Sequence, residues 1–499
     1  MTARSSMDIA VVGNGVLGLS IAAEIARRAP KLNIAVIGPP GRNLSASMAA
    51  GAMLNCFGEA TKYTHQHPAA EAKFAIARQA LDEWPAWLDR LCDDVGHDAT
   101  ALRASRTGGT FVLLSGRSGQ LAQENFQAMR AALIKYDEPH EQVDPQDIEG
   151  LDPSPSARPS HAVHLPREGA IDARAVVTAL EAAACRHGVH ILPATVQALL
   201  AGADTVTGVR FTDGSTLRAD TVILAAGSAS SALADTVLPP GETPPMLHGN
   251  GLSLLTRRTV PHRAREVLRT PIRAGSCGLH LVPLAREDWE YIGANNMVTL
   301  HPAHGPGVGD GHAFLRQICE HLDQKIASSQ VTQWLHGARP MSLDCFPLIG
   351  ESSLRGLHFA TGTYRDGFHC SPVIARQVAD TVLNQATTNP DFDWFTPKRL
   401  PIQTMTVEQA IAEFASHEVD AAYEYGLTLP FWLDSETVAQ HSRQRARRVH
   451  EELDELVALP PDNLMALQGL TASEGLADLR LYLHAARTYH QKPTQATAV

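Results

Sequence analysis

The pattern of apolar positions at the start of this chain predicts a strand, a helix and a second strand. A short run of mostly β-branched residues covers 9–12, a glycine-rich turn covers 13–18, and an Ala-rich stretch leads to Arg28. A second apolar run follows at 33–37. Continuous short apolar runs are typical of buried strands, whereas the longer Ala-rich stretch between them is typical of a helix. We therefore expect the chain to open with a βαβ unit.

The same reading predicts a mixture of helices and strands through the body of the chain. Apolar residues at three- and four-residue spacing predict a helix over 71–91. Further helices are predicted over 119–134, 175–185, 310–328 and 371–385. Strands are predicted over 110–114, 189–192, 195–200 and 221–227, with a hairpin over 208–215 and several short strands between 245 and 300. The segment 152–159 is rich in Pro and Ser, which predicts a linker.

Beyond about residue 400 the pattern becomes helical, with predicted helices over 407–425, 434–458 and 472–490. One face of the second helix carries an apolar stripe that consists of Val449, Leu453, Leu456 and Val457. A lone helix is marginally stable in water, so this stripe is expected to be buried. It would pack on the rest of the chain, cover a site or form a subunit interface, and we favour a homodimer contact slightly over packing within the chain.

Charge argues against a nucleic-acid partner. The most basic segment is 443–448, and it is followed within one turn by four acidic residues at 451–455, which is typical of a solvated helix face. Over all 499 residues the net charge is −11, and no long block of one sign occurs. The chain is therefore not expected to bind nucleic acid.

Length and cysteine content narrow the class further. A chain of 499 residues exceeds one ordinary core, so two or three domains are expected. No apolar run reaches membrane-spanning length. The seven cysteines are odd in number and lack any C-x-x-C pair, which argues against a disulfide framework and a structural zinc site. We expect no bound metal, no membrane association and a reducing, cytoplasmic location.

The glycine-rich turn carries the first chemical signal. Gly13 permits a tight turn, Gly15 allows the backbone to approach a pyrophosphate, and Gly18 allows the helix to pack closely on the strand. The helix that starts near Val16 then presents free N–H groups and its positive dipole end to phosphates. Between a strand and a helix, this G-x-G-x-x-G spacing predicts dinucleotide binding.

One part of the usual dinucleotide site is missing. The second strand of such a unit commonly ends in Asp or Glu, which binds the ribose hydroxyls. Here the strand end at 36–41 contains no carboxylate, and Arg42 follows it. Arg42 would suit a 2′-phosphate and hence NADP. The alternative is FAD with its ribose held by backbone or water, and these residues alone leave both open.

Four separated motifs resemble one flavoprotein family. The segment 337–350 is similar to the G-x-R-P-x-[ST]-x-D-x-x-P-x-I-G signature of D-amino acid oxidase-type flavoproteins, and most closely to their glycine oxidase and sarcosine oxidase branch. The segment 357–368 resembles the closing strand, turn and helix start of that branch. The segment 46–54 resembles the loop along the flavin, and 221–227 the family's A-A-G strand end. The resemblance spans roughly 7–390.

The resemblance implies an α/β fold, α+β overall, in which a Rossmann-like FAD-binding domain is interleaved with an antiparallel-sheet substrate domain. The FAD-binding domain would comprise 7–90, 160–235 and 335–390. The substrate domain would comprise 91–159 and 236–334, and residues 400–499 would form a helical C-terminal extension.

FAD is the cofactor that the resemblance implies, and the chain has no second glycine fingerprint for a nicotinamide cofactor. Cys345 lies too close to Arg339 to match the attachment cysteine of sarcosine oxidases, so we expect non-covalent FAD. The residues implied at the cofactor are Gly13, Gly15, Val16, Gly18, Ala46, Ser47, Ala50, Gly51, Met53, Val196, Ala226, Gly227, Arg339, Asp366, Gly367, Phe368 and His369.

Four residues are candidates for the chemistry by the same resemblance. Arg339 matches the arginine that pairs with the substrate carboxylate, a task that suits a planar guanidinium. Arg365 matches a second arginine near the mouth of the site, with a structural carboxylate pair as the alternative. His280 stands where the branch usually has a tyrosine, although a histidine in a strand is more often a core residue. Asn296 matches a position that faces the flavin, and no lysine lies near it.

These residues imply oxidation of a small carboxylated amine. The substrate would give a hydride from Cα to flavin N5, the imine would hydrolyse, and O2 would reoxidise the flavin to give H2O2. Backbone N–H groups near Gly367 and Phe368 would stabilise negative charge on the reduced flavin. The alternatives are a dehydrogenase that passes electrons to a carrier and a flavin-containing structural subunit of a hetero-oligomer.

Overall fold

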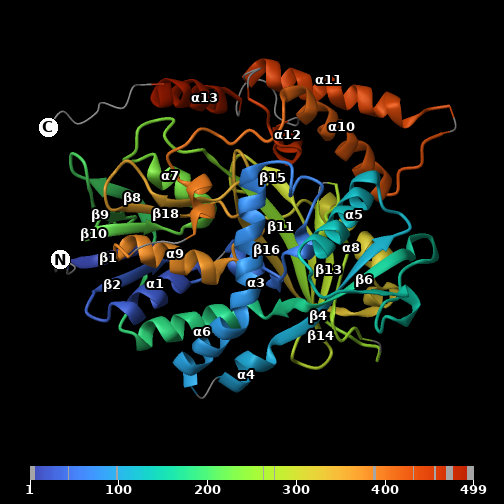
Figure 1. Ribbon diagram of the computed structural model, residues 1–499, viewed down its shortest axis with the longest axis horizontal. Helices are drawn as coiled ribbons and strands as arrows, with labels where there is room; N and C mark the ends of the chain where they lie inside the picture. Colours follow the sequence, from blue (N-terminus) through green and yellow to red (C-terminus); the bar gives the residue numbers. More distant parts are fainter. Residues whose placement is uncertain are drawn as a thin grey trace.

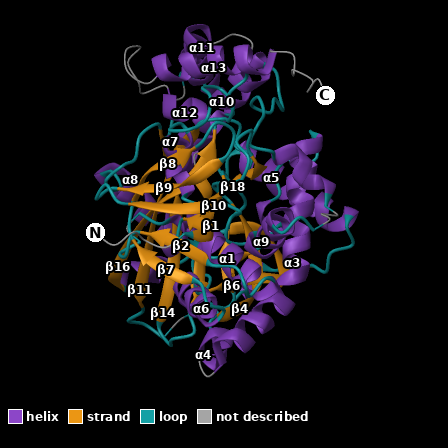
Figure 2. Ribbon diagram, turned by 90° about the vertical axis from the view of Figure 1, so that its left-hand side faces the viewer, coloured by secondary structure: helices purple, strands orange, loops and turns teal. Residues whose placement is uncertain are grey.

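Two sheets with helices around them form the body of the protein, and four further helices cover one side of it (Figures 1 and 2). The computed structural model describes residues 6–42, 44–96, 99–261, 263–274, 276–385, 389–430, 432–453, 457–467 and 476–491. None of the helices in these ranges is long and apolar enough to cross a lipid bilayer.

The first sheet contains the predicted βαβ unit. Its main path runs β17 (Leu348–Glu351), β18 (Leu357–Thr361), β10 (Thr216–Leu224), β1 (Met7–Val12), β2 (Ile34–Gly38) and β7 (His190–Pro193), and β8 (Val196–Ala201) and β9 (Val206–Phe211) extend it beside β10. The strands from β18 to β7 are parallel to their neighbours on this path. The sheet is therefore of the doubly wound kind, whose ligands bind beyond the carboxyl ends of the strands.

Alternate residues of β1 face two different cores. Ile9 and Val11 pack against α1 (Val16–Arg28), α3 (Pro68–Val95), α6 (Ala173–Arg186) and α9 (Ser371–Val382), which lie together on one face in Figure 1. Ala10 and Val12 pack on the other face with β8, β9 and α7 (Ser230–Ala234). All four side chains are buried, which explains why β1 is apolar throughout rather than alternating.

The second sheet is mostly antiparallel. Its path runs β15 (Met297–Thr299), β11 (Met246–Arg257), β14 (Trp289–Asn295), β13 (Ser276–Pro283), β12 (Val267–Arg269), β4 (Arg106–Ser115), β6 (Pro159–Ile171) and β3 (Met53–Leu54), with β16 (Gln330–Ser342) on β11 and β5 (Glu141–Val143) on β6. Only β12 and β4 are parallel among the described pairs of this sheet. The helix α8 (Val308–His321) packs on this sheet through Phe314 and Ile318.

Shorter elements complete the body. They are the helices α2 (Ala46–Ala49), α4 (Ala99–Ala104) and α5 (Gln120–Lys135), and the 3-10 turns Phe57–Glu59, Pro145–Asp147, Pro155–Ala157, Gly227–Ala229, Gln324–Ser328 and Pro390–Phe395.

Most predicted elements are confirmed within a few residues, and the hairpin at 208–215 and the strand at 221–227 prove to be parts of β9 and β10. The helix predicted over 310–328 is wrong in length, because α8 ends at His321. Asp323 is fully buried against Arg258, and a 3-10 turn follows it. Asp323 has extended backbone, and its side chain accepts from the N–H of Lys325 at 2.9 Å at the start of that turn, which apolar spacing alone does not reveal.

The linker predicted at 152–159 is docked rather than free. The backbone N–H groups of Asp152 and Ser154 donate to the carbonyl groups of Leu322 and Glu320, at the end of α8. The Pro- and Ser-rich segment is therefore irregular backbone whose N–H groups are bonded to the end of α8. The predicted domain ranges stay a prediction, but β3, nearly all of β6 and residues 335–342 of β16 pair in the second sheet although they fall within ranges expected for the FAD-binding domain.

The C-terminal helices lie together over one side of the body (Figure 1). They are α10 (Val407–Glu424), α11 (Ser435–Leu453), α12 (Pro461–Leu467) and α13 (Leu476–Gln491). The helix predicted over 434–458 ends at Leu453, 454–456 lie outside the described residues, and α12 was not predicted. Of the apolar stripe, Val449 and Leu453 are buried in one core with α10, α12 and α13, so packing within the chain accounts for both.

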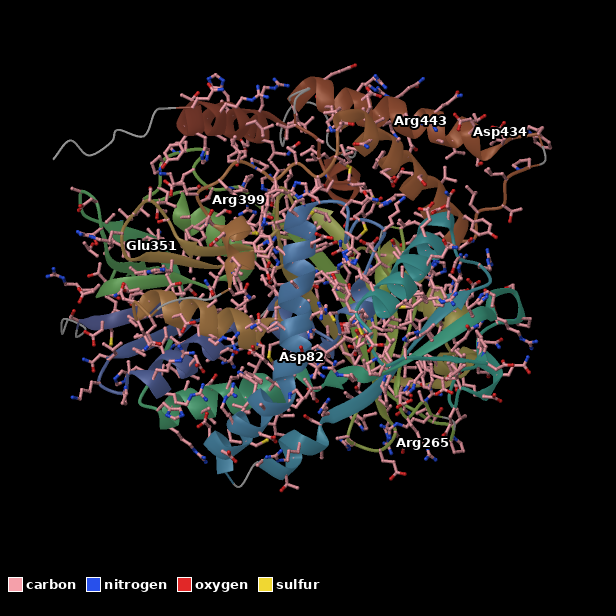
Figure 3. All side chains as sticks on the ribbon, in the orientation of Figure 1. Asp82, Arg265, Glu351, Arg399, Asp434 and Arg443 are labelled. Atoms are coloured by element: carbon pink, nitrogen blue, oxygen red, sulfur yellow. The ribbon has the colours of Figure 1, made fainter. Side chains whose placement is uncertain are left out.

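This C-terminal core is continuous with the body. It includes Met341 and Leu343 of the signature segment 337–350. Beside them, Nη2 of Arg399 donates to both carboxylate oxygens of Asp344 at 2.9 and 3.0 Å, and Figure 3 shows Arg399 below the outer helices. The signature aspartate thus holds the chain that leads into α10.

Removing a buried ring from this core should destabilise the fold strongly. Phe414 of α10 is fully buried, so Phe414→Ala should lower the free energy of unfolding by about 3–5 kcal/mol, because the cavity lacks atoms to fill it. Leu481→Ala on α13, whose side chain is 68% exposed, should cost less than about 1 kcal/mol. Urea denaturation followed by circular dichroism measures both, and equal effects would show that α10 is not part of the cooperative core.

Candidate active site

A cavity of about 760 Å³, hereafter the main cavity, opens where the carboxyl ends of β1 and β10 meet β11 and β16. Among the residues predicted at a cofactor, those that line it are Gly13, Gly15, Val16, Ala46, Ser47, Ala50, Val196, Ala226, Gly227, Arg339, Gly367 and Phe368. The remaining five, Gly18, Gly51, Met53, Asp366 and His369, lie outside its lining. Residues from six distant parts of the chain therefore converge on one cavity.

The glycine turn has the geometry that phosphate binding needs. Gly13 has φ of +125°, and a Cβ atom there would lie 2.1 Å from the carbonyl oxygen of Ala225. Gly18 supports the turn from behind, since its Cβ would lie 1.9 Å from the oxygen of Gly13. At Gly15 a Cβ would meet only Ser47 within 4 Å, so the backbone is open on the cavity side. The start of α1 therefore fits a pyrophosphate.

The end of β2 carries no carboxylate, and its Gly38 makes room for the side chain of Asn14. A Cβ atom at Gly38 would lie 2.3 Å from the side chain of Asn14, whose Nδ2 donates to the oxygen of Pro39 at 3.1 Å. Arg42 donates from Nε to the oxygen of Asn14 at 3.0 Å and forms an ion pair with Glu181. Its charge is thus already paired, which disfavours the 2′-phosphate alternative.

The start of α9 faces the other end of the main cavity. Gly367 and Phe368 line the cavity, and the ring of Phe368 stacks on Trp84 with 6.1 Å between centroids. Asp366 instead pairs with Lys73 at 2.9 Å. His369 is buried, with Nε2 2.8 Å from the oxygen of Ala77. These two predicted residues support the helix start from outside the main cavity.

Arg339 lies in the cavity wall, where a glycine on the neighbouring strand makes room for its guanidinium. In the antiparallel ladder between β11 and β16, Gly249 pairs with Arg339. A Cβ atom at Gly251 would lie 2.5–2.7 Å from the guanidinium atoms, so the guanidinium lies flat over this backbone. Any side chain at residue 251 would displace it.

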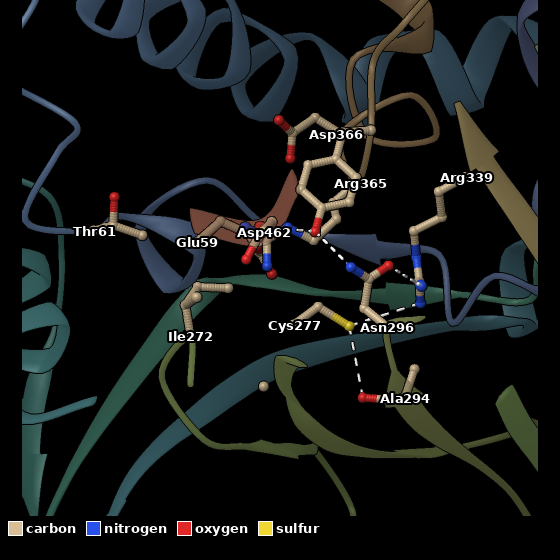
Figure 4. A network of polar contacts seen from close by, with 12 residues as sticks. Glu59, Thr61, Ile272, Cys277, Ala294, Asn296, Arg339, Arg365, Asp366 and Asp462 are labelled. Carbon is tan, nitrogen blue, oxygen red and sulfur yellow. Dashed lines mark hydrogen bonds and ion pairs between the residues drawn. The ribbon is translucent and has the colours of Figure 1, made fainter. Parts of the chain in front are cut away.

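The guanidinium of Arg339 is held by neutral acceptors. Nη1 donates to the oxygen of Asn295 at 3.1 Å and to Oδ1 of Asn296 at 3.0 Å, and Nη2 lies 3.7 Å from Sγ of Cys277 (Figure 4). Within the described part of the chain, no carboxylate lies within ion-pair distance of it. The chemistry of a half-buried cation without a counterion in a cavity wall fits an anionic ligand.

Arg365 and Tyr364 stand between the main cavity and a second cavity of about 230 Å³, since both residues line both. The guanidinium of Arg365 lies 4.7 Å from the centroid of the Tyr364 ring, and its Nε lies 3.8 Å from Glu59. Arg365 thus has a carboxylate partner within the chain, which is what the structural interpretation of this residue requires. The second cavity is also lined by α10 and α12, through His417 and Asp462.

The other two catalytic candidates are buried behind the cavity wall. Asn296 is 8% exposed and joins Arg339 to Tyr364, because its Nδ2 donates to Oη of Tyr364 at 2.8 Å. His280 lines neither cavity. Its ring stacks on Tyr291 at 5.7 Å beneath Gly51, and Nδ1 lies 3.2 Å from the oxygen of Gly278. Its surroundings are those of a core histidine.

Several residues at the cavity were not singled out by the sequence. Ser253 and Tyr291 both donate to the carbonyl oxygen of Ala49, at 3.1 and 2.8 Å, and so fix the loop 46–54. Tyr364 stands next to Arg365 in a motif that was recognised, but the partners of its hydroxyl come from distant parts of the chain. Only the tertiary structure reveals them.

The buried state of His280 predicts acid sensitivity. Burial, with the nearby charge of Arg269, lowers the pKa of His280 to about 3. In the unfolded chain the side chain of His280 binds a proton near pH 6.5, whereas in the folded chain it stays neutral at that pH. The free energy of unfolding therefore falls as the pH drops below 6.5. When the pH is lowered from 6 to 5, the free energy of unfolding of His280→Gln should therefore fall by about 1 kcal/mol less than that of the wild type. Urea denaturation at both pH values measures this, and identical losses would mean that His280 is protonated in the fold.

Comparison with known proteins gives this site its context. Residues 8–381 match the family model described as FAD dependent oxidoreductase. The glycine oxidase of Geobacillus kaustophilus is 25% identical over 389 residues, which cover 76% of this chain and 94% of that protein. A bifunctional ThiO/ThiG protein of Trichormus variabilis is 26% identical over 76% of this chain but only 53% of its own length.

Solved structures agree on the fold. The crystal structure of the Geobacillus kaustophilus glycine oxidase covers 80% of this chain and 100% of its own, with a TM-score of 0.66 and 21% identity. The iminodiacetate oxidase of Chelativorans sp. BNC1 covers 79% of this chain and all of its own, with a TM-score of 0.64 and 15% identity. The family match makes FAD the cofactor of this chain, and the open helix start at Gly13–Val16 in the main cavity fits its pyrophosphate. The chain belongs to the FAD-dependent oxidoreductase family of the D-amino acid oxidase type.

Proposed function

We propose that this protein oxidises a small amine that carries a carboxylate, either an amino acid or an N-alkyl amino acid. The observation that carries the proposal is Arg339, a cation in the wall of the FAD cavity whose partners in the described chain are neutral. Relatives named glycine oxidase and a structural neighbour named iminodiacetate oxidase support this substrate class.

The chain's own residues would divide the work of holding FAD. The turn from Gly13 to Val16 would bind the pyrophosphate, and the loop 46–50 would lie along the flavin. The positive end of α9, beside Gly367 and Phe368, would stabilise negative charge on the ring. Bound FAD supplies the acceptor for a hydride from the substrate.

Arg339 would bind and orient the substrate. Its planar guanidinium can meet both oxygens of a carboxylate, which fixes the direction of the Cα–H bond. The neutral contacts from Asn295 and Asn296 hold the guanidinium without neutralising it. The product imine would hydrolyse to an oxo acid and ammonia or an amine.

Reoxidation by O2, with release of H2O2, belongs to the same proposal. The cations that line the main cavity are the arginines Arg42, Arg339 and Arg365, and no lysine belongs to its described lining. Electron transfer to a carrier is the alternative. Peroxide formation in air distinguishes the two.

The FAD should be bound without a covalent link. The described lining of the main cavity contains no cysteine, and Cys345 lies instead at the second cavity. The purified protein should be yellow, and acid precipitation should release FAD into the supernatant. Flavin that stays with the precipitated polypeptide would contradict non-covalent binding, and a colourless protein would contradict the assignment of the cavity.

An anaerobic bleaching screen tests the function directly. Among amino acids and N-methyl amino acids, at least one should reduce the flavin. Arg339→Ala should lower kcat/KM for that substrate some tens- to hundreds-fold, which corresponds to a loss of roughly 2–4 kcal/mol of transition-state stabilisation. FAD content should stay unchanged. Arg339→Lys should recover only part of the loss, because an ammonium lacks the planar fork.

Two results would contradict this proposal. Unchanged kinetics in a folded, FAD-loaded Arg339→Ala variant would remove Arg339 from the site. Failure of every amine to bleach the flavin would favour a flavin-containing structural subunit.

A further inference from the structure

A chain of hydrogen bonds connects Arg339 to the C-terminal helices (Figure 4). Arg339 donates to Oδ1 of Asn296 at 3.0 Å, and Asn296 donates to Oη of Tyr364 at 2.8 Å. Tyr364 in turn donates to Oδ2 of Asp462 at 3.0 Å. Asp462 lies in the first turn of α12, beyond the end of the family match at residue 381.

The direction of each bond in this chain is fixed. Arginine has only donors, so the amide of Asn296 must turn its oxygen toward Arg339 and its nitrogen toward Tyr364. The Tyr364 oxygen then accepts from Asn296, and its own proton goes to the carboxylate of Asp462. Burial, followed by the charge of Asp462, raises the pKa of Tyr364, which keeps that proton in place. The polarity that Arg339 imposes thus ends at Asp462, whose carboxylate accepts the proton of Tyr364.

The backbone holds Tyr364 where these bonds require it. Tyr364 has φ of 52°, which is unusual for a bulky residue, and its N–H donates to the oxygen of Pro340 at 2.8 Å. The ring is 6% exposed, and Arg365 lies over it. The hydroxyl thus has little freedom to find another acceptor.

Asp462 is held as firmly from its own side. The neighbouring Asn463 is fully buried, and its Nδ2 donates to the carbonyl oxygen of Leu343 at 2.7 Å. Leu464 and Leu467 of α12 are fully buried in the core that also contains Met341 and Leu343. The helix is therefore docked on the same signature segment that carries Arg339.

We propose that Asp462 is a positioning residue of the active site, which orients Arg339 toward the substrate carboxylate through Tyr364 and Asn296. This inference rests on the proposed function, because it requires that Arg339 binds a carboxylate. It assigns the C-terminal helices a role in substrate binding in addition to their packing. Groups that orient a binding side chain without touching the ligand commonly change affinity strongly.

A double-mutant cycle on the FAD-loaded protein tests the connection. The probe is acetate, a carboxylate without an amine, and the readout is its Kd from the change in the flavin absorption spectrum. Asp462→Ala and Tyr364→Phe should each weaken acetate binding roughly 3- to 20-fold, within the range of coupled residues in one network. The double variant should be no weaker than the weaker single variant, because both substitutions break the same chain.

Two further variants act as controls. Asp434→Ala removes a carboxylate of the same C-terminal region that accepts from Thr437 at 3.0 Å at the start of α11 and lies at the outer edge of the molecule in Figure 3. It should leave the acetate Kd unchanged. Asp462→Asn keeps an acceptor for Tyr364, so it should restore most of the affinity lost in Asp462→Ala. If Asp462→Ala does not fold, Tyr364→Phe tests the same connection from its other end.

The outcomes separate this inference from the proposed function. Failure of every amine to bleach the flavin overturns the proposed function and this inference with it. If an amine bleaches the flavin, wild-type protein that does not bind acetate, or an Arg339→Ala variant that binds it as the wild type does, overturns carboxylate binding by Arg339 and this inference with it. Acetate binding that depends on Arg339 but is unchanged in Asp462→Ala or in Tyr364→Phe overturns only the role of Asp462. Additive losses in the double variant, or an equal loss in Asp434→Ala, also overturn it.

Discussion

The antiparallel ladder between β11 and β16 is the constraint on which the other features of the site depend. It places Arg339 opposite Gly249 and near Gly251, whose missing side chain leaves room for the guanidinium. The same strand β16 bonds the chain just before the loop 46–54, since the N–H of Ala338 donates to the oxygen of Leu44 at 3.1 Å. One strand therefore contacts the start of the loop 46–54 and also carries Arg339.

The electrostatic pattern around this strand distinguishes one arginine from the others. Arg258, Arg365 and Arg399 each face a carboxylate, so burial of their charge is compensated within the chain. Arg339 faces a carbonyl oxygen and an amide oxygen instead. Neutral acceptors fix its geometry but leave its charge uncompensated. A ligand carboxylate would then complete the ion pair, which is the physical basis for placing the substrate there.

Local pattern predicted much of this structure, because local pattern determines helices and buried strands. The turn at Gly13 and the helices α3, α5 and α10 follow from spacing alone. The family resemblance singled out Arg339, which lines the cavity, because this residue belongs to a contiguous motif. The role of Tyr364 could not be predicted, because Asn296 and Asp462 lie far from it in the sequence and only folding brings them together. For His280, strand position indicates burial but not which residue lies opposite.

The coupling between the C-terminal helices and the site has a thermodynamic consequence in both directions. Met341 and Tyr364 belong to the same apolar core as Phe414 and Leu464. The docking of α10 and α12 and the geometry of the site therefore depend on the same packing contacts. If Asp462 in its docked position improves carboxylate binding at Arg339, then a bound carboxylate must stabilise that docked position by the same factor. The segment beyond the family domain would then respond to the state of the active site without contacting the substrate.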